Sequence, residues 1–360
     1  MRILFITAHP YLPQLIGGMQ TSTDQLCRSL QQRGHHVAVL VGLTPVGWRG
    51  FLSRIKQQIN ARLFGCKTAR DQDCGYPVWR AWFPWEAVAY VVRQERPEVI
   101  VVVAGEPVRM GLAAQATGTP IIMQLQNVEF QLHGMEFKAL GPVACVSNSR
   151  FTADAYAEAY QVPSEIIYPF MTPDAYLTET SRANVTFINP VPLKGRDIAL
   201  RIAAHCPDIP FAFVEAWPLN DQDKQDLMRE LAHLPNVTLL PPQKDMRKVY
   251  GKCKILLAPS LWNEGYGRVA TEAQFSGIPV VASTRGGLPE AVGTGGVVLD
   301  PEAPIADWVA VIRKLWEDDA YYKAMSAAAL AYANRPDIGI EHHIEMWENV
   351  MQRVIGGAIR

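Results

Sequence analysis

The chain has 360 residues, which is long for a single hydrophobic core and therefore predicts two domains. Hydrophobic residues make up 49% of the chain and charged residues 19%, as is typical of an α/β protein with packed sheets. The net charge of −1 argues against a nucleic-acid binder, because such proteins concentrate Lys and Arg. We therefore expect no nucleic-acid partner.

Secretion and membrane insertion are not expected either. No apolar run reaches the ~18 residues that a membrane-spanning helix needs, and the first apolar run is too short for a signal peptide. The six cysteines lie scattered, without a close pair at the spacing of a zinc or redox site. These observations predict a cytoplasmic protein with reduced thiols.

The first half of the chain alternates short apolar runs with longer amphipathic segments. Continuous apolar runs are typical of parallel strands buried on both faces, so the order predicts a Rossmann-like domain. The expected strands are residues 3–7, 37–41, 99–104, 121–123, 142–146 and 166–168, with a helix at 20–32 after the first. The G-x-G-x-x-G pattern is absent, so a bound dinucleotide is not supported.

Residues 48–70 are basic and have no acidic member. Their apolar side chains recur at four-residue spacing, as on one face of a helix: Phe51, Ile55, Ile59 and Leu63. Such a helix lies on an anionic membrane surface or packs its apolar face on its own domain with the basic face in water. An aromatic-rich stretch from Trp79 to Trp85 follows, and it belongs to the same surface or to an acceptor cleft.

The second half repeats the strand and helix pattern after a polar, proline-containing segment. Residues 170–180 predict a linker between a first domain, 1–169, and a second, 181–336. Expected strands are residues 185–188, 211–214 and 236–240, and expected helices are 198–204, 307–314, 321–332 and 341–354.

Residues 252–293 carry the most informative pattern in the chain. Two buried strands, at 255–258 and 280–282, flank a glycine-containing loop and a helix that begins near Arg268. Free backbone N–H groups at such a helix start bind anions. Glu264 and Glu272 would repel phosphate and are expected to accept hydrogen bonds from hydroxyl groups. A nucleotide sugar offers both a phosphate and hydroxyls.

Glu264 and Glu272 stand eight positions apart in the stretch PSLWNEGYGRVATEAQFSGIPVVAS. This arrangement resembles the paired-glutamate motif of family 4 glycosyltransferases. The resemblance implies the α/β fold named GT-B: two Rossmann-like α/β/α domains facing a central cleft. It also implies that residues 337–360 form a C-terminal helix that crosses back to the N-terminal domain. The implied reaction is transfer of a sugar from a nucleotide diphosphate sugar to an acceptor hydroxyl, with retention of configuration.

The resemblance assigns roles to individual residues of the second domain. Lys194 matches a family lysine that reaches the donor pyrophosphate, and the backbone of Gly265, Tyr266, Gly267 and Arg268 would hold the same group. Glu264 would accept hydrogen bonds from the sugar, and Glu272 from the ribose.

In the first domain the resemblance points to two further places. Gly17 and Gly18 resemble the family's N-terminal glycine loop, which lies near the donor phosphate and the acceptor. Gln126 stands where many relatives have a histidine beside the reacting sugar. A glutamine can hydrogen-bond a hydroxyl but cannot exchange protons, so a proton role is not carried over. His133 lies nearby in the sequence, and we expect it to be structural.

Two departures from the family pattern lie in the second domain. Asn189 stands where family members usually have a second cation, an arginine, and we hypothesise that Arg268 helps to replace it. The segment Glu215-Ala216-Trp217 lies where relatives often have a glycine-rich turn. The rim of the site is therefore expected to differ in shape.

The resemblance predicts a UDP- or GDP-sugar as donor and a carbohydrate, lipid-linked or small-molecule acceptor. No Asp-x-Asp motif stands in this arrangement, and neither a metal nor another cofactor is expected. If residues 48–70 bind a membrane, the protein is peripheral on the inner face. Two alternatives remain open: a catalytically silent nucleotide-sugar binding protein, motivated by Gln126 and Asn189, and a glycoside hydrolase that uses the two glutamates.

Overall fold

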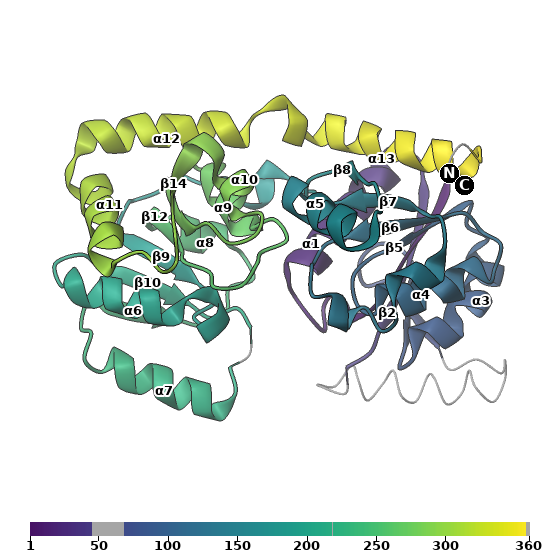
Figure 1. The fold of residues 1–360 in the computed structure, drawn as a ribbon, viewed down its shortest axis with the longest axis horizontal. Coiled ribbons are helices and arrows are strands. Elements are labelled where there is room, and N and C mark those ends of the chain that lie inside the picture. Colours follow the sequence, from purple (N-terminus) through teal and green to yellow (C-terminus); the bar gives the residue numbers. More distant parts are fainter. Residues whose placement is uncertain (45–67, 218, 358–360) are drawn as a thin grey trace. The chain divides into compact units, whose positions relative to one another are not determined.

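The computed structural model describes residues 1–44, 68–217 and 219–357 (Figure 1). It divides into two compact units: Met1–Phe170 with Ile340–Arg360, and Met171–Gly339. Of the predicted linker, residues 170–180, Phe170 belongs to the first unit and residues 171–180 belong to the second. No helix within the described ranges has both the length and the apolar character to cross a membrane.

The first unit is built on an eight-stranded sheet in the order β3-β4-β2-β1-β5-β6-β7-β8. Its pairings are parallel apart from β3 with β4. The strands are β1 (Arg2–Pro10), β2 (His36–Gly42), β3 (Ala69–Asp71), β4 (Val78–Ala81), β5 (Val99–Val102), β6 (Ile121–Leu125), β7 (Ala144–Ser147) and β8 (Glu165–Ile166).

Helices cover both faces of this sheet because its strands are apolar on both sides (Figure 1). The helices are α1 (Gly18–Gln32), α3 (Pro84–Glu95), α4 (Pro107–Gln115), α5 (Arg150–Tyr160) and α13 (Ile340–Ile355). Ile3 and Phe5 of β1 pack in one cluster with α1 and α13. Leu4 and Ile6 point the other way, to a cluster that contains residues of α3 and α4.

The second unit holds a fully parallel six-stranded sheet in the order β11-β10-β9-β12-β13-β14. The strands are β9 (Asn184–Ile188), β10 (Phe211–Val214), β11 (Val237–Leu240), β12 (Cys253–Ala258), β13 (Val280–Ser283) and β14 (Gly296–Leu299). The helices are α6 (Arg196–His205), α7 (Asp221–Leu231), α8 (Arg247–Tyr250), α9 (Arg268–Gln274), α10 (Leu288–Val292), α11 (Ile305–Glu317) and α12 (Asp319–Ala333).

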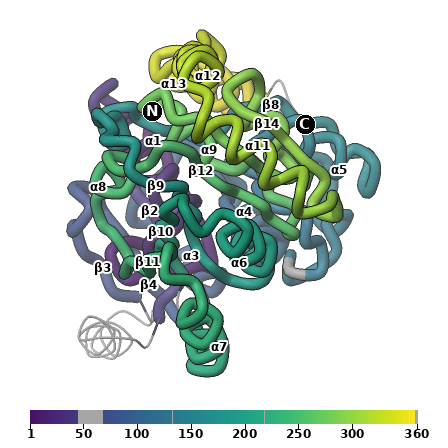
Figure 2. The backbone as a smooth tube through the Cα atoms, turned by 90° about the vertical axis from the view of Figure 1, so that its left-hand side faces the viewer, coloured from purple at the N-terminus to yellow at the C-terminus, as the bar shows by residue number. Residues whose placement is uncertain are grey.

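Helices α6 and α11 share one apolar cluster with the strands of the second unit, while α9 contacts both α10 and α12. Helix α7 buries only Leu227 and lies at the outer margin of the unit (Figure 2). Short 3-10 turns complete both units: η1 (Phe130–Leu132), η2 (Phe137–Leu140), η3 (Pro173–Ala175), η4 (Pro192–Lys194), η5 (Gly293–Gly295) and η6 (Pro336–Ile338).

Several sequence expectations differ from the structure around residues 48–85. The predicted basic helix, within residues 48–70, falls mostly outside the described residues, and its last residues, 69 and 70, belong to strand β3. Trp79 lies in β4 at 7% exposure, and its indole N–H donates to Glu95 Oε1 at 2.8 Å. This tryptophan is therefore a core residue of the sheet and belongs neither to a membrane surface nor to an acceptor cleft.

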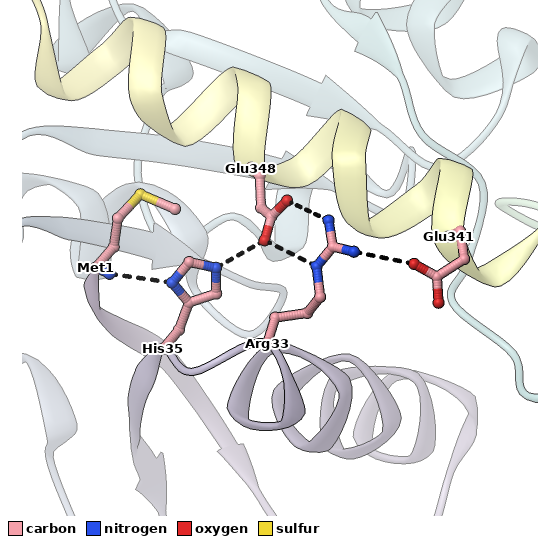
Figure 3. A network of polar contacts seen from close by, with 5 residues as sticks. All are labelled: Met1, Arg33, His35, Glu341 and Glu348. Carbon is pink, nitrogen blue, oxygen red and sulfur yellow. Dashed lines mark hydrogen bonds and ion pairs between the residues drawn. The ribbon is translucent and has the colours of Figure 1, made fainter.

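A polar network ties α13 to the end of α1 (Figure 3). Glu348 Oε2 accepts from Arg33 at 2.9 Å, and Glu348 Oε1 lies 2.8 Å from His35 Nε2. Arg33 also donates to Glu341 at 3.0 Å. Behind this network the apolar side of α13, including Trp347 at 1% exposure, packs into the core of the first unit.

The hydrogen bond from Arg33, and to a lesser degree that from His35, holds the pKa of Glu348 below the ordinary value of 4.5. Because its pKa is lower in the folded than in the unfolded state, the ionised Glu348 stabilises the fold above about pH 4.5. This contribution is lost as the pH falls through the lowered value.

We predict that Glu348→Gln weakens the packing of α13 by about 1 kcal/mol at pH 7, because it removes a charge-assisted hydrogen bond. Amide hydrogen exchange of residues 340–355 should become faster in the variant at pH 7 and equal to wild type under acid conditions. Asn349→Gln, at an exposed position of the same helix, is the control. Equal exchange in all three proteins at pH 7 would contradict the role of this network.

Candidate functional site

The candidate site begins with two neighbouring parallel strands of the second unit. Strands β9 and β12 pair in parallel, so their carboxyl ends deliver the following loops to the same edge of the sheet. Gly195 has φ +82°, and a Cβ there would lie 1.9 Å from the carbonyl oxygen of Pro259. Only glycine fits this close approach, which brings η4 against the end of β12.

Lys194 and Glu264 meet where these two loops come together. Lys194 Nζ lies 2.5 Å from Glu264 Oε1, and their side chains are only 16% and 18% exposed. The backbone keeps the loops in place, since the N–H groups of Leu261 and Trp262 both donate to the carbonyl of Leu193 at 3.0 Å. A cation and a carboxylate are thus held side by side in a poorly solvated place.

The loop that carries Glu264 rests on a pair of glycines. Glu264 forms a parallel bridge with Gly286, and the N–H of Gly287 donates to the Glu264 carbonyl at 2.7 Å. A Cβ on Gly286 would lie 2.2 Å from that carbonyl oxygen, and one on Gly287 would lie 2.6 Å from the Gly265 oxygen. In a sequence, a pair of adjacent glycines is typical of a turn and does not reveal that these glycines support the site.

The next residues set the start of α9. Gly267 has φ +98°, and a Cβ there would lie 2.6 Å from Leu288 Cδ2. The Tyr266 side chain is 2% exposed, and its hydroxyl lies 3.0 Å from Thr271 Oγ1 and accepts from Arg335 at 3.2 Å. Tyr266 therefore turns its ring into the core and has only its backbone to offer a ligand. Helix α9 follows with seven residues.

Glu272 is buried at 7% exposure, with hydrogen bonds to both carboxylate oxygens. Oε1 accepts from Arg268 Nε at 3.1 Å, and Oε2 accepts from the Tyr250 hydroxyl at 2.9 Å. Burial, together with the charge of Glu272, raises the pKa of Tyr250 well above its ordinary value, so this hydroxyl stays protonated and donates. The sequence analysis predicted neither contact. Tyr250 is the last residue of the short helix α8, and no sequence pattern marks it as a partner of Glu272.

Arg268 also donates to the hydroxyl of Tyr176 at 2.7 Å. Tyr176 is 4% exposed and its ring stacks on Phe275, with the centroids 6.4 Å apart. The guanidinium is therefore held between Glu272 and a residue of the predicted linker segment. Its expected contribution to the diphosphate stays a prediction, and its visible task is to balance the charge of Glu272.

Asn189 follows β9 in the left-handed region, with φ +66°, which Asn tolerates better than most residues. It is 5% exposed, and its Oδ1 accepts the N–H of Trp217 at 3.1 Å. The ring of Trp217 in turn lies against Lys194, with 4.9 Å from Nζ to the ring centroid. Asn189 thus connects two loops of the site.

The remaining candidates belong to the first unit. Gly17 is the N-cap of α1, where its carbonyl accepts from the N–H of Thr21 at 3.0 Å, and Gly18 is the first helical residue. Gln126 follows β6 and is half-buried, and its carbonyl accepts from Asn148 Nδ2 at 3.1 Å. The structure brings Lys194, Glu264 and Asn189 together around Trp217 in the second unit, with Arg268 and Glu272 forming a cluster of their own on α9.

His133 is structural, as expected. It is 1% exposed, its Nε2 lies 3.0 Å from the Tyr156 hydroxyl, and its ring stacks on that tyrosine. Burial lowers its pKa to about 4, so the ring is neutral near pH 7. Within the described part of the chain, no three His, Cys, Asp or Glu side chains gather as metal ligands would.

Two family descriptions match the chain. Residues 17–165 match the glycosyl transferase 4-like domain, and residues 200–318 match the glycosyl transferases group 1. The chain belongs to family 4 of the glycosyltransferases. The family resemblance based on Glu264 and Glu272 is thereby confirmed.

Curated relatives of this family 4 member match it over part of their length. The D-inositol 3-phosphate glycosyltransferase of Corynebacterium kroppenstedtii is 42% identical over 115 residues, which are 31% of this chain and 25% of that relative. The enzyme of the same name from Mycolicibacterium smegmatis is 34% identical over 163 residues, 43% of this chain and 37% of the relative. The matched stretches thus span about a quarter to about a third of these relatives.

Solved structures match nearly the whole chain and show its fold. HepE of Anabaena, in complex with UDP and glucose, has a TM-score of 0.76 at 19% identity and covers 98% of this chain and 99% of its own. Sucrose-phosphate synthase of Thermosynechococcus elongatus has a TM-score of 0.75 at 15% identity and covers 99% of both chains. The expected GT-B fold, with two Rossmann-like domains, is confirmed.

We predict that Arg268→Met lowers the stability of the second unit by about 3 kcal/mol, because it leaves the buried Glu272 carboxylate without its cation. The double variant Arg268→Met/Glu272→Gln should recover part of this loss, since no buried charge remains unpaired. Thermal unfolding of the single and double variants measures both effects.

Arg229→Met is the matched control for this prediction, because Arg229 pairs with Asp226 on the exposed side of α7. Its effect should stay within about 0.5 kcal/mol. A loss in Arg268→Met no larger than that of the control would contradict the assigned role of Arg268.

Proposed function

We propose that this protein transfers a sugar from a nucleoside diphosphate sugar to an acceptor hydroxyl, with retention of the anomeric configuration. The observation that carries the proposal is the Lys194–Glu264 pair, joined at 2.5 Å at the carboxyl ends of β9 and β12. The cation suits the diphosphate of the donor, and the carboxylate suits the hydroxyls of its sugar. Membership of family 4 and the GT-B fold both support the interpretation of this arrangement as a donor site.

Lys194 would stabilise the leaving diphosphate. When the bond from the sugar to the phosphate breaks, negative charge grows on the phosphate oxygen, and a nearby cation lowers the barrier. The ammonium group has three N–H donors, so it can keep Glu264 Oε1 and also reach a phosphate oxygen. Because its side chain is 16% exposed, water competes little for these donors.

Glu264 would orient the sugar. Its carboxylate accepts several hydrogen bonds, and Lys194 occupies one oxygen in the structure. Hydroxyl groups on the sugar could occupy the remaining positions. The backbone contacts with Gly286 and Gly287 would hold the carboxylate at a constant position relative to the reacting carbon of the sugar.

Glu272 would hold the ribose of the nucleotide. Arg268 and Tyr250 fix its orientation and satisfy part of its hydrogen-bonding capacity. Because each carboxylate oxygen accepts more than one hydrogen bond, ribose hydroxyls could bind to the same group. Arg268 would in this case act as a partner of Glu272 and of the diphosphate together.

We further propose that the reaction needs no metal ion, because Lys194 and backbone N–H groups would carry the charge of the diphosphate. A UDP-sugar is the first donor to test, since HepE of Anabaena has been solved with UDP and glucose. The roles of Gly17, Gly18 and Gln126 in the first unit stay predictions from the family resemblance. The acceptor class and a membrane contact through residues 48–70 stay predictions of the sequence.

We predict that one class of donor, in a panel of UDP-, GDP-, ADP- and TDP-sugars, raises the melting temperature of the wild-type protein at millimolar concentration. The same donor should be cleaved or transferred in the presence of EDTA. Lys194→Ala should lower kcat/KM by about 100-fold, because it removes the charge that stabilises the leaving group. Lys248→Ala, at an exposed position of α8, is the control and should leave both readouts unchanged.

The outcomes separate the possible functions. Binding of a nucleotide sugar without cleavage or transfer would favour the catalytically silent binding protein. Cleavage of a simple glycoside without any response to nucleotide sugars would favour the hydrolase. Loss of activity in EDTA would overturn the metal-independent reaction but not the donor site.

A further inference from the structure

The loop after β10 presents an exposed aromatic side chain on a firmly held backbone. Trp217 is 44% exposed. The N–H of Glu215 donates to the Leu240 carbonyl at 2.9 Å, and the Glu215 carboxylate lies 3.5 Å from Lys224 Nζ on α7. The N–H of Trp217 donates to Asn189 Oδ1 at 3.1 Å. The backbone that carries the indole is thus held by contacts with the ends of β11 and β9 and with α7.

The anchor of this loop is Asn189. Its side chain is buried and turned toward the backbone of Trp217, and its own N–H donates to the Val214 carbonyl at 2.7 Å. These bonds join the end of β9 to the end of β10. Asn189 and the 215–217 segment, the two departures of this chain at the site, therefore form one connected structure.

The indole of Trp217 faces Lys194. The ammonium nitrogen lies 4.9 Å from the ring centroid, within the range of a cation–π interaction. The ring attracts the cation without using any of its N–H donors. Lys194 is consequently held between the Glu264 carboxylate and the Trp217 ring, and the N–H donors that Glu264 does not use remain available to a ligand.

We propose that Trp217 is a positioning residue that holds the Lys194 ammonium in place for the donor diphosphate. The inference rests on the proposed function. A lysine side chain is long and flexible, so its interaction with the diphosphate depends on where its ammonium group is held. Asn189 stands where family members usually have a second cation. Together with Trp217 it instead holds the Lys194 ammonium in place. Trp217 acts on the ligand through Lys194.

The test measures binding of a nucleoside diphosphate by calorimetry, using whichever of UDP, GDP, ADP and TDP stabilises the wild type most. Trp217→Ala should raise Kd by about tenfold, and Trp217→Phe should recover most of the affinity, because a phenyl ring keeps a cation–π contact. Asn189→Gly keeps the left-handed backbone but releases the loop, and should weaken binding in the same direction.

A double-mutant cycle distinguishes positioning from a merely structural role. In the Lys194→Met background, Trp217→Ala should change Kd by less than about twofold, since the cation that it positions is gone. Trp316→Ala is the matched control: Lys254 Nζ also lies 4.9 Å from the Trp316 ring, away from the loops of the site. This variant should bind the nucleotide as the wild type does.

Equal affinity of wild type and Trp217→Ala would overturn the inference, while the proposed function would stand if the wild type transfers sugar. The same tenfold loss in the wild-type and Lys194→Met backgrounds would also overturn it, because Trp217 would then act without Lys194. If the wild type neither binds nor cleaves any nucleotide sugar, the proposed function fails first and the inference fails with it.

Discussion

The parallel pairing of β9 with β12 is the constraint on which the candidate site depends. It sends two loops from distant parts of the sequence to one edge of the sheet, where Lys194 and Glu264 form a close, mostly buried ion pair. Glycine at 195, 286 and 287 permits the backbone approaches that bring these loops together. Without this packing, the two charges would be ordinary surface groups of little use to a ligand.

The second glutamate, Glu272, lies in a more buried environment than Glu264. Glu272 is almost fully buried, and its charge is tolerated because Arg268 and Tyr250 both donate to it. Arg268 is itself fixed by Tyr176, so the orientation of the carboxylate is set before a ligand arrives. Such preorganised groups are effective in binding and catalysis, because little reorganisation is needed when the substrate enters.

The sequence predicted the apolar strands well, because a buried parallel strand is a continuous apolar run, as in Phe211–Val214. It missed the short β4, in which Trp and Arg interrupt the apolar pattern, and the glycine-led β14. At the site, the spacing of Glu264 and Glu272 pointed to the family, and the resemblance then assigned a role to Lys194. The partners Tyr176 and Tyr250 were not predicted, since Tyr176 and Arg268 are separated by 92 residues and meet only through packing.

A crystal structure of the protein with the nucleoside diphosphate that stabilises it most would test the central claim directly. The account predicts a phosphate oxygen within about 3 Å of Lys194 Nζ and the ribose hydroxyls on the Glu272 carboxylate. The nucleotide should also leave Glu264 facing the space where the sugar would stand. A nucleotide bound elsewhere in the chain, with Lys194 and Glu264 joined only to each other, would contradict the account.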